Sequence, residues 1–149
     1  MADIENLVNG LTDENDTHAY SCLKELEELS EQSNKVYKYF DVFVEMLSSP
    51  SSYIRTRGFL LIAANARWDE DNGIDEIIDT ILECISDEKP ITARQCIKAL
   101  PILAKHKSEL KEDTINALRR INVTIYAESM QSLVNKDVSE ALARITKGN

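Results

Sequence analysis

Glycine, proline and cysteine are scarce in this sequence, which contains four, three and three of them among 149 residues. Glycine and proline disfavour helix interiors, so their scarcity beside abundant Leu, Ile, Ala, Glu and Lys favours α-helices over β-strands. The cysteines are odd in number and widely spaced, at Cys22, Cys84 and Cys96. We therefore expect no disulfide framework and a reducing, cytoplasmic location.

Long hydrophobic runs are also missing. No apolar run approaches the roughly 20 residues that a transmembrane helix needs. The first residues, Met-Ala-Asp-Ile-Glu-Asn, lack the basic start and apolar middle of a secretory signal. We therefore expect no membrane association. The length fits one domain that is large enough to bury a hydrophobic core.

Positive charge is scarce in the first third of the chain. The net charge is −9, and residues 1–50 carry 3 basic and 11 acidic groups, whereas residues 111–149 carry 6 and 5. An acidic N-terminal third repels phosphate backbones, which argues against general nucleic-acid binding.

The spacing of apolar residues predicts a series of amphipathic helices and no strand. Six isoleucines and leucines between residues 74 and 85 recur at i, i+3, i+4, i+7, i+8 and i+11, which predicts one continuous helix there. Apolar spacing predicts the other helices over residues 3–10, 17–30, about 33–47, 51–68, 91–105 and about 110–121, with two short ones near 124–134 and 136–147.

The helix predicted over residues 51–68 is the centre of the pattern. Ser51 follows Pro50 and offers a capping side chain at its start. The apolar run from Phe59 to Ala64 covers the whole helix circumference, so we expect burial on most sides. Gly58 in mid-helix costs about 1 kcal/mol relative to alanine, and the expected compensation is close approach of a neighbouring helix.

Similar blocks recur along the chain. Ile54-Arg55-x-x-Gly58-x-x-Leu61-Ile62 aligns with Thr92-Ala93-x-x-Cys96-x-x-Ala99-Leu100 at an offset of 38, and with His18-Ala19-x-x-Cys22-x-x-Glu25-Leu26 at an offset of 36. Such a period, with two helices per unit, indicates a stacked α-solenoid. The predicted single domain, 1–149, has an N-terminal cap helix (1–16), three repeats (17–50, 51–87 and 88–122) and C-terminal cap helices (123–149).

The block that starts at Ile54 resembles the first helix of HEAT and armadillo-type repeats, which has an aliphatic residue, an arginine and then small and aliphatic positions. The resemblance covers residues 17–134, although Ala93 replaces the arginine in the later unit. It implies an all-α, right-handed superhelix of about three to four helix pairs. It also implies that second helices line a concave face, which such proteins commonly use to bind other proteins.

Acidic residues recur on the predicted second helices, and with one tryptophan they form the candidate partner-binding set: Asp41, Glu45, Asp75, Asp79, Glu83 and Trp68. By the geometry of the resembled family, the carboxylates would line an electronegative groove for a basic partner. The alternative is that they are the solvated backs of amphipathic helices. Trp68 follows the central helix, where it either caps the core or forms an exposed binding anchor.

Motifs for chemistry are weak. His18 and Cys22 share a helix face, but a metal site needs three or four ligands. The acidic loop 69–73 fails the calcium-loop spacing, because Trp68 would occupy the first ligand position. We expect that loop to be a solvated turn before a helix N-terminus. We therefore expect no catalytic residue, no metal and no cofactor.

Basic residues cluster on the predicted first helices and their ends: Arg55, Arg57, Arg67, Arg94, Lys98, Lys105 and Lys107. Arg55 lies about 20° from Ile62 on the helical wheel, which predicts a partly buried arginine paired with a carboxylate or with backbone.

Three functions remain open from the sequence. The leading hypothesis is a non-enzymatic scaffold that binds another protein, with a basic one favoured, on an acidic concave face. The alternatives are a nucleic-acid enzyme resembling the HEAT-like DNA glycosylases and a structural subunit that associates with itself, as a homodimer.

Overall fold

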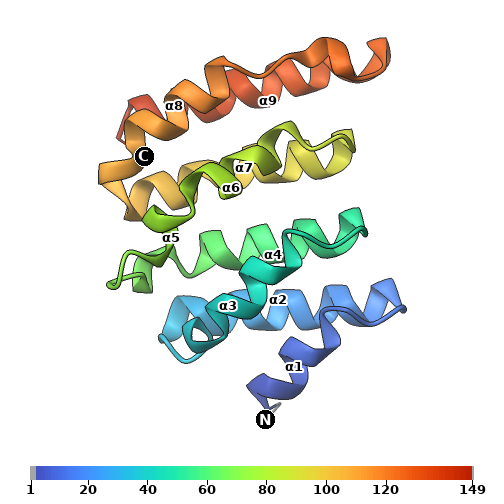
Figure 1. Cartoon of the computed structure of the whole chain (residues 1–149), viewed down its shortest axis with the longest axis vertical. Helices are drawn as coiled ribbons and strands as arrows, with labels where there is room; N and C mark the ends of the chain where they lie inside the picture. The colour runs from blue at the N-terminus through green and yellow to red at the C-terminus, as the bar shows by residue number, and fades with distance from the viewer. Residues whose placement is uncertain (1–2, 149) are drawn as a thin grey trace.

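The computed structural model describes residues 3–148, which are helical throughout except for their connecting loops and contain no β-strand (Figure 1). Within this range the α-helices are α1 (Ile4–Gly10), α2 (Asp16–Gln32), α3 (Phe40–Met46), α4 (Ser52–Ala64), α5 (Gly73–Glu76), α6 (Ile78–Glu83), α7 (Pro90–His106), α8 (Lys111–Arg119) and α9 (Glu128–Thr146). Short 3₁₀ turns are η1 (Tyr37–Tyr39), η2 (Ala66–Trp68), η3 (Cys84–Ser86), η4 (Ser108–Leu110) and η5 (Val123–Ile125). The all-α prediction is confirmed.

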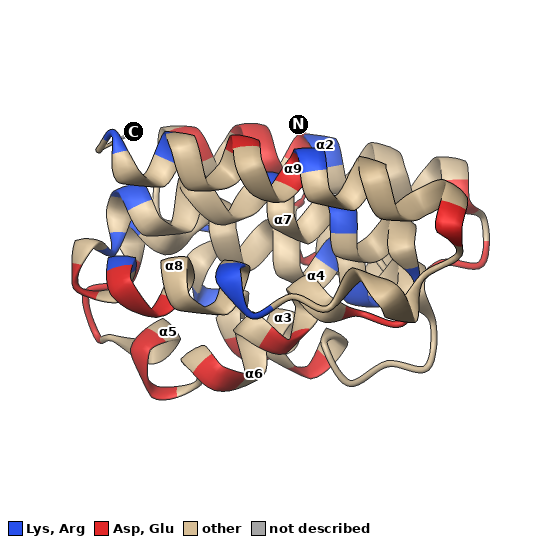
Figure 2. Ribbon diagram, turned by 90° about the horizontal axis from the view of Figure 1, so that it is seen from above, with Lys and Arg blue, Asp and Glu red and all other residues tan. Residues whose placement is uncertain are grey.

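The helices form two layers. The long helices α2, α4, α7 and α9 lie side by side in chain order, and the short helices α3, α5, α6 and α8 lie across one side of them (Figures 1 and 2). Helix α4 packs on α2, α3 and α7, and α7 packs on α9. None of the helices in the described range combines the length and hydrophobicity needed to cross a lipid bilayer.

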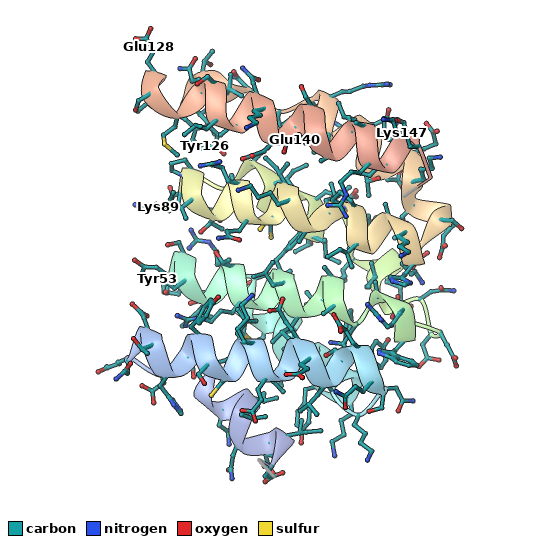
Figure 3. All side chains as sticks on the ribbon, turned by 180° about the vertical axis from the view of Figure 1, so that it is seen from behind. Tyr53, Lys89, Tyr126, Glu128, Glu140 and Lys147 are labelled. Atoms are coloured by element: carbon teal, nitrogen blue, oxygen red, sulfur yellow. The ribbon has the colours of Figure 1, made fainter. Side chains whose placement is uncertain are left out.

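The long helices run in the same direction. Tyr53, Lys89 and Glu128, which lie at or beside the starts of α4, α7 and α9, follow one another along one edge, and Lys147 lies at the opposite edge (Figure 3). The C-terminal ends of these helices therefore lie together at the edge where Lys147 is found.

The predicted cap, close approach and burial of the central helix are confirmed, but α4 ends at Ala64 and does not continue to Trp68, which lies in η2. The Ser51 side chain accepts a hydrogen bond from the Ile54 amide at 3.4 Å, which caps α4. A Cβ atom on Gly58 would lie 2.8 Å from both the Phe43 carbonyl oxygen and the Met46 Cβ. Glycine at this position therefore lets α3 approach α4 closely. Phe59, also in α4, is completely buried.

The helix predicted over residues 74–85 is interrupted. Ile77 leaves the helical conformation, with φ −119° and ψ 22°, and separates α5 from α6. Apolar spacing could not reveal this break, because both pieces bury isoleucines, Ile74 in α5 and Ile81 in α6. Helix α5 is instead positioned by polar contacts from Asp69 and Lys107, which are described below.

Two other predicted helix boundaries are wrong. The helix expected to start near residue 33 begins as η1 and becomes α-helical only at Phe40. The two short helices expected near 124–134 and 136–147 are one helix, α9. Its buried side chains, Val134, Asp137, Ala141 and Ile145, continue at three- and four-residue spacing through the expected break.

Candidate functional site

Four of the predicted acidic residues lie exposed on the short-helix layer. Asp41 and Glu45 belong to α3, and Asp79 and Glu83 belong to α6. Figure 2 shows acidic residues gathered along this layer. We call these four side chains the acidic face. The structure thus places the carboxylates of two different short helices on the same side of the molecule.

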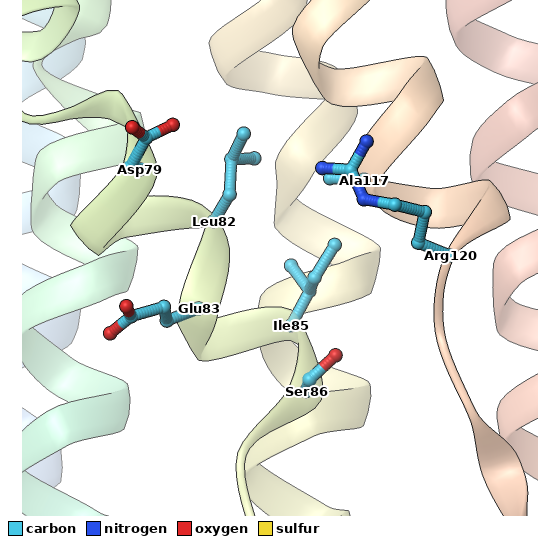
Figure 4. Close-up of a pocket in the computed structure, with 7 residues that line it drawn as sticks. All are labelled: Asp79, Leu82, Glu83, Ile85, Ser86, Ala117 and Arg120. Carbon is cyan, nitrogen blue, oxygen red and sulfur yellow. The ribbon is translucent and has the colours of Figure 1, made fainter.

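A hollow of about 700 Å³ lies between α6 and α8, beside the acidic face. Asp79 and Glu83 line one side of it, and Arg120 follows α8 on the other (Figure 4). Buried apolar side chains, including Leu82 and Ala117, also line it. Its complete lining is Asp79, Leu82, Glu83, Ile85, Ser86, Ala117 and Arg120. This α6–α8 hollow combines an apolar lining with charged borders.

A second hollow, of about 410 Å³, lies between α3 and α5. It is lined by Tyr37, Lys38, Phe40, Asp41, Val44, Asp71, Gly73, Glu76 and Ile77. Three of these residues are acidic, and three are aliphatic or phenylalanine side chains that pack against the core. This α3–α5 hollow therefore repeats the composition of the α6–α8 hollow between an earlier pair of short helices.

Asp75 does not share the free exposure of the acidic face. Its carboxylate lies 2.8 Å from the Lys107 ammonium group, whose side chain is only 4% exposed. Lys107 also lies 3.1 Å from the Asp69 carboxylate and 3.2 Å from that of Glu109. Burial lowers the pKa of Lys107, but the neighbouring carboxylates outweigh burial and hold it above its usual value. Asp75 is thus part of an internal ion-pair network.

Asp69 connects this network to two further elements. Its carboxylate accepts hydrogen bonds from the Gly73 and Ile74 amides, at 3.0 and 2.9 Å, and from the Tyr37 hydroxyl. Burial raises the pKa of Asp69, yet these donors and Lys107 outweigh it, so the pKa lies below its usual value. The expectation of a solvated acidic turn is therefore wrong for Asp69, which is a buried cap for α5.

Two arginines of the long helices, Arg55 of α4 and Arg94 of α7, are engaged in structural ion pairs. Arg55 donates to both Asp87 carboxylate oxygens, at 2.8 and 2.9 Å, and to the carbonyl oxygens of Ser49 and Pro50. The predicted pairing of Arg55 with carboxylate and backbone is confirmed. Arg94 pairs in a similar way with Asp137 on α9, at 2.6 Å. These side chains join neighbouring elements and leave little of their charge for a ligand.

Arg57, on α4, is also engaged within the fold. It bonds to the carbonyl oxygen of Leu11 at 2.9 Å and to the carboxylate of Asp16 at 3.2 Å. These contacts tie the central helix to the C-terminal end of α1 and to the first residue of α2.

Trp68 has a structural partner. Its indole N–H donates to the carbonyl oxygen of Ser30 at 2.7 Å, and the side chain is partly buried. Ser30 lies near the end of α2 and Trp68 in η2 after α4, so the bond joins the ends of two long helices. The geometry favours the core-capping interpretation over the exposed binding anchor.

The cysteines are all free and buried. The Cys22 sulfur lies 3.7 Å from the His18 Nε2 atom. Burial and nearby Glu25 raise the pKa of Cys22, which disfavours the reactive thiolate. Among residues 3–148, no three His, Cys, Asp or Glu side chains are arranged to hold a metal ion.

Sequence reasoning missed four exposed apolar side chains near the N-terminal ends of the long helices. Tyr20, Tyr53, Ile91 and Ile125 are between 56% and 62% exposed. A signal was present, since Tyr53 and Ile91 are separated by the repeat offset of 38 residues. Tyr53 and Ile91 are the second residues of α4 and α7, whereas Tyr20 lies in the second turn of α2 and Ile125 in η5 before α9.

Comparisons with known proteins found no match, whether to family models, to curated proteins or to solved structures.

Proposed function

We propose that this protein is a non-enzymatic scaffold that binds a basic segment of another protein on its acidic face. The observation that carries the proposal is the combination of exposed carboxylates with the α3–α5 and α6–α8 hollows on one layer. Lysine and arginine side chains of a partner would meet the carboxylates, and its apolar side chains would enter the hollows. The volumes of the hollows are within the range of side-chain and small-ligand pockets.

We also propose that the two helical layers are a solenoid of HEAT-like units, in which the short helices line the concave side. The parallel long helices and the equivalent positions of α3, α6 and α8 support this arrangement. A concave acidic face would concentrate field lines and speed the association of a positively charged partner. Three free, buried cysteines suit a reducing compartment such as the cytoplasm.

The test is affinity capture with three baits, in the presence of nuclease. The parent is compared with an Asp79→Lys, Glu83→Lys variant and with a Glu28→Lys, Glu31→Lys control. The control makes the same charge change at exposed positions of α2, on the long-helix layer. We expect proteins that bind the parent and the control at low salt to be lost from the Asp79, Glu83 variant. Equal recovery on all three baits would refute binding on this face.

Self-association is a second candidate, which the exposed apolar side chains of Tyr20, Tyr53, Ile91 and Ile125 favour. It predicts a dimer mass in light scattering that reverts to a monomer in a Tyr53→Ser, Ile91→Ser variant. A monomer at all concentrations would refute it. A nucleic-acid enzyme has less support, because Arg55, Arg57 and Arg94 are paired with carboxylates.

A further inference from the structure

A hollow of about 500 Å³ lies at the C-terminal ends of the long helices, away from the acidic face. It is lined by Arg67, Ile102, Lys105, His106, Arg144 and Lys147. These residues come from η2, α7, α9 and the position after α9. Elements that are far apart in sequence therefore contribute basic side chains to one place. We call it the basic hollow.

The basic hollow has no acidic side chain in its lining, although the chain carries a net charge of −9. Among residues 3–148, Arg67, Lys105, Arg144 and Lys147 form no ion pair, in contrast to Arg55 and its partner Asp87. The Nε atom of Arg67 is buried and has no hydrogen-bond partner within that range. A buried donor without a partner is costly, so the protein groups within that range do not fully satisfy the Arg67 guanidinium group.

Helix ends alone explain part of this arrangement. Cations near helix C-termini are stabilised by the helix dipole, which suits Lys105 and Arg144. The dipole does not account for the convergence of four permanent cations on one hollow, nor for the unsatisfied Nε atom of Arg67. The environment of His106 points the same way. Burial, and then the charges of Arg67 and Lys105, hold the pKa of His106 below its usual value.

We propose that the basic hollow binds a small phosphate monoester, with the phosphate among the cations and an apolar group of the ligand against Ile102. Four permanent positive charges complement a doubly charged anion better than a singly charged carboxylate. Ile102 is 37% exposed, which leaves apolar surface for the organic part of the ligand. This site is separate from the acidic face and does not depend on the function proposed for that face.

The test uses phenyl phosphate as the probe and the two histidines as reporters, at constant ionic strength. A bound anion stabilises the imidazolium form, so saturating phenyl phosphate should raise the pKa of His106 in an NMR titration. His18, in α2, should not respond. Inorganic phosphate should bind more weakly than phenyl phosphate, because it lacks the apolar group. A His106 shift that does not saturate, or that His18 shares, would overturn the proposal.

A pair of double variants distinguishes specific binding in the basic hollow from general attraction of the anion to positive charge. An Arg67→Gln, Arg144→Gln variant should bind phenyl phosphate at least about tenfold more weakly, since each charged hydrogen bond typically contributes that much. A Lys98→Gln, Lys136→Gln control removes the same charge from exposed positions of α7 and α9 and should leave binding within about twofold. Equal losses in the two variants would overturn the proposal.

A second variant and a competing probe complete the test. If the Arg67, Arg144 variant does not fold, a Lys105→Gln, Lys147→Gln variant makes the same test with two exposed side chains. A short single-stranded oligonucleotide is the competing probe. If it binds more tightly than phenyl phosphate and is lost in the same variant, the hollow is a nucleic-acid contact and the small-molecule proposal is wrong.

Discussion

Replacing Lys107 with methionine should strongly destabilise the fold. The methionine keeps the approximate length of the side chain but removes the ammonium group that lies 2.8–3.2 Å from Asp69, Asp75 and Glu109. It also removes the donor to the Asp69 carbonyl oxygen, at 3.0 Å, and to the Asn72 side chain, at 2.8 Å. The Asp69 carboxylate, which is 0% exposed, would then be a buried charge without its cation.

The magnitude follows from this burial. Removing one partner of a buried ion pair typically costs about 3–5 kcal/mol, because the remaining charge is left uncompensated. The free energy of unfolding of a natural domain is about 5–15 kcal/mol. The substitution should therefore remove a large share of the stability. A Lys136→Met control should change it by less than about 1 kcal/mol, since that ammonium is exposed and lies 4.0 Å from Glu140.

Urea unfolding, followed by Trp68 fluorescence and by circular dichroism, measures the difference. The pH dependence supplies a second check. The pKa of Asp69 is lowered in the folded parent, so Asp69 contributes stability above its unfolded value of about 3.9, and that contribution is lost as the pH falls through the folded-state pKa. Without Lys107 this lowering is weakened, so the gap in unfolding free energy between parent and variant should stay constant from pH 7 to about pH 4 and narrow as the pH falls further.

An additional Asp69→Asn substitution should recover part of the stability lost at pH 7, because it removes the uncompensated charge. The reasoning would be refuted if Lys107→Met were as stable as the Lys136→Met control, or if the gap between parent and variant widened as the pH fell.

Three further predictions concern other contacts. Gly58→Ala should destabilise the fold by about 1–2 kcal/mol in urea unfolding despite the better helix propensity of alanine, because its Cβ meets the Phe43 carbonyl oxygen; a stabilised variant would show that α3 moves freely. Asp87→Ala should lower the free energy of unfolding by about 3 kcal/mol at pH 7, because it leaves the Arg55 charge without its carboxylate, and by less below pH 4, where Asp87 of the parent becomes protonated. An unchanged midpoint of urea unfolding at pH 7 would contradict this. Cys96 should react with a thiol reagent only after unfolding, since Cys84 and burial raise its pKa, and rapid labelling of the folded protein would contradict that burial.

Features set by neighbours in sequence were predictable. The Ser51 cap depends on an amide three residues away. The close approach at Gly58 was predictable, because glycine destabilises a helix relative to alanine and a buried glycine is therefore expected where a neighbouring helix needs the space. Arg55 was placed correctly from its position near the apolar side of the helix.

Features set by distant partners were not predictable. Lys107 bonds to the carbonyl oxygen of Asp69, which lies 38 residues away, and nothing near Lys107 in the sequence distinguishes it from an exposed lysine. Lys107 also pairs with Asp75 of α5, close to the non-helical residue Ile77. The spacing of apolar residues predicts neither this ion pair nor the break in the helix. The four carboxylates of the acidic face were predicted, whereas the hollows beside them were not. The carboxylates follow a simple spacing, but the hollows beside them form between helices.

The central claim is that a basic partner lies against the short helices. Amide hydrogen exchange of the chain, alone and with a partner recovered by the capture experiment, tests it most directly. The account predicts that the partner slows amide exchange in α3, in α6 and in the η3 turn that follows α6, with little change along the exposed side of α2. Protection confined to the long helices, with unchanged exchange over α3 and α6, would contradict it.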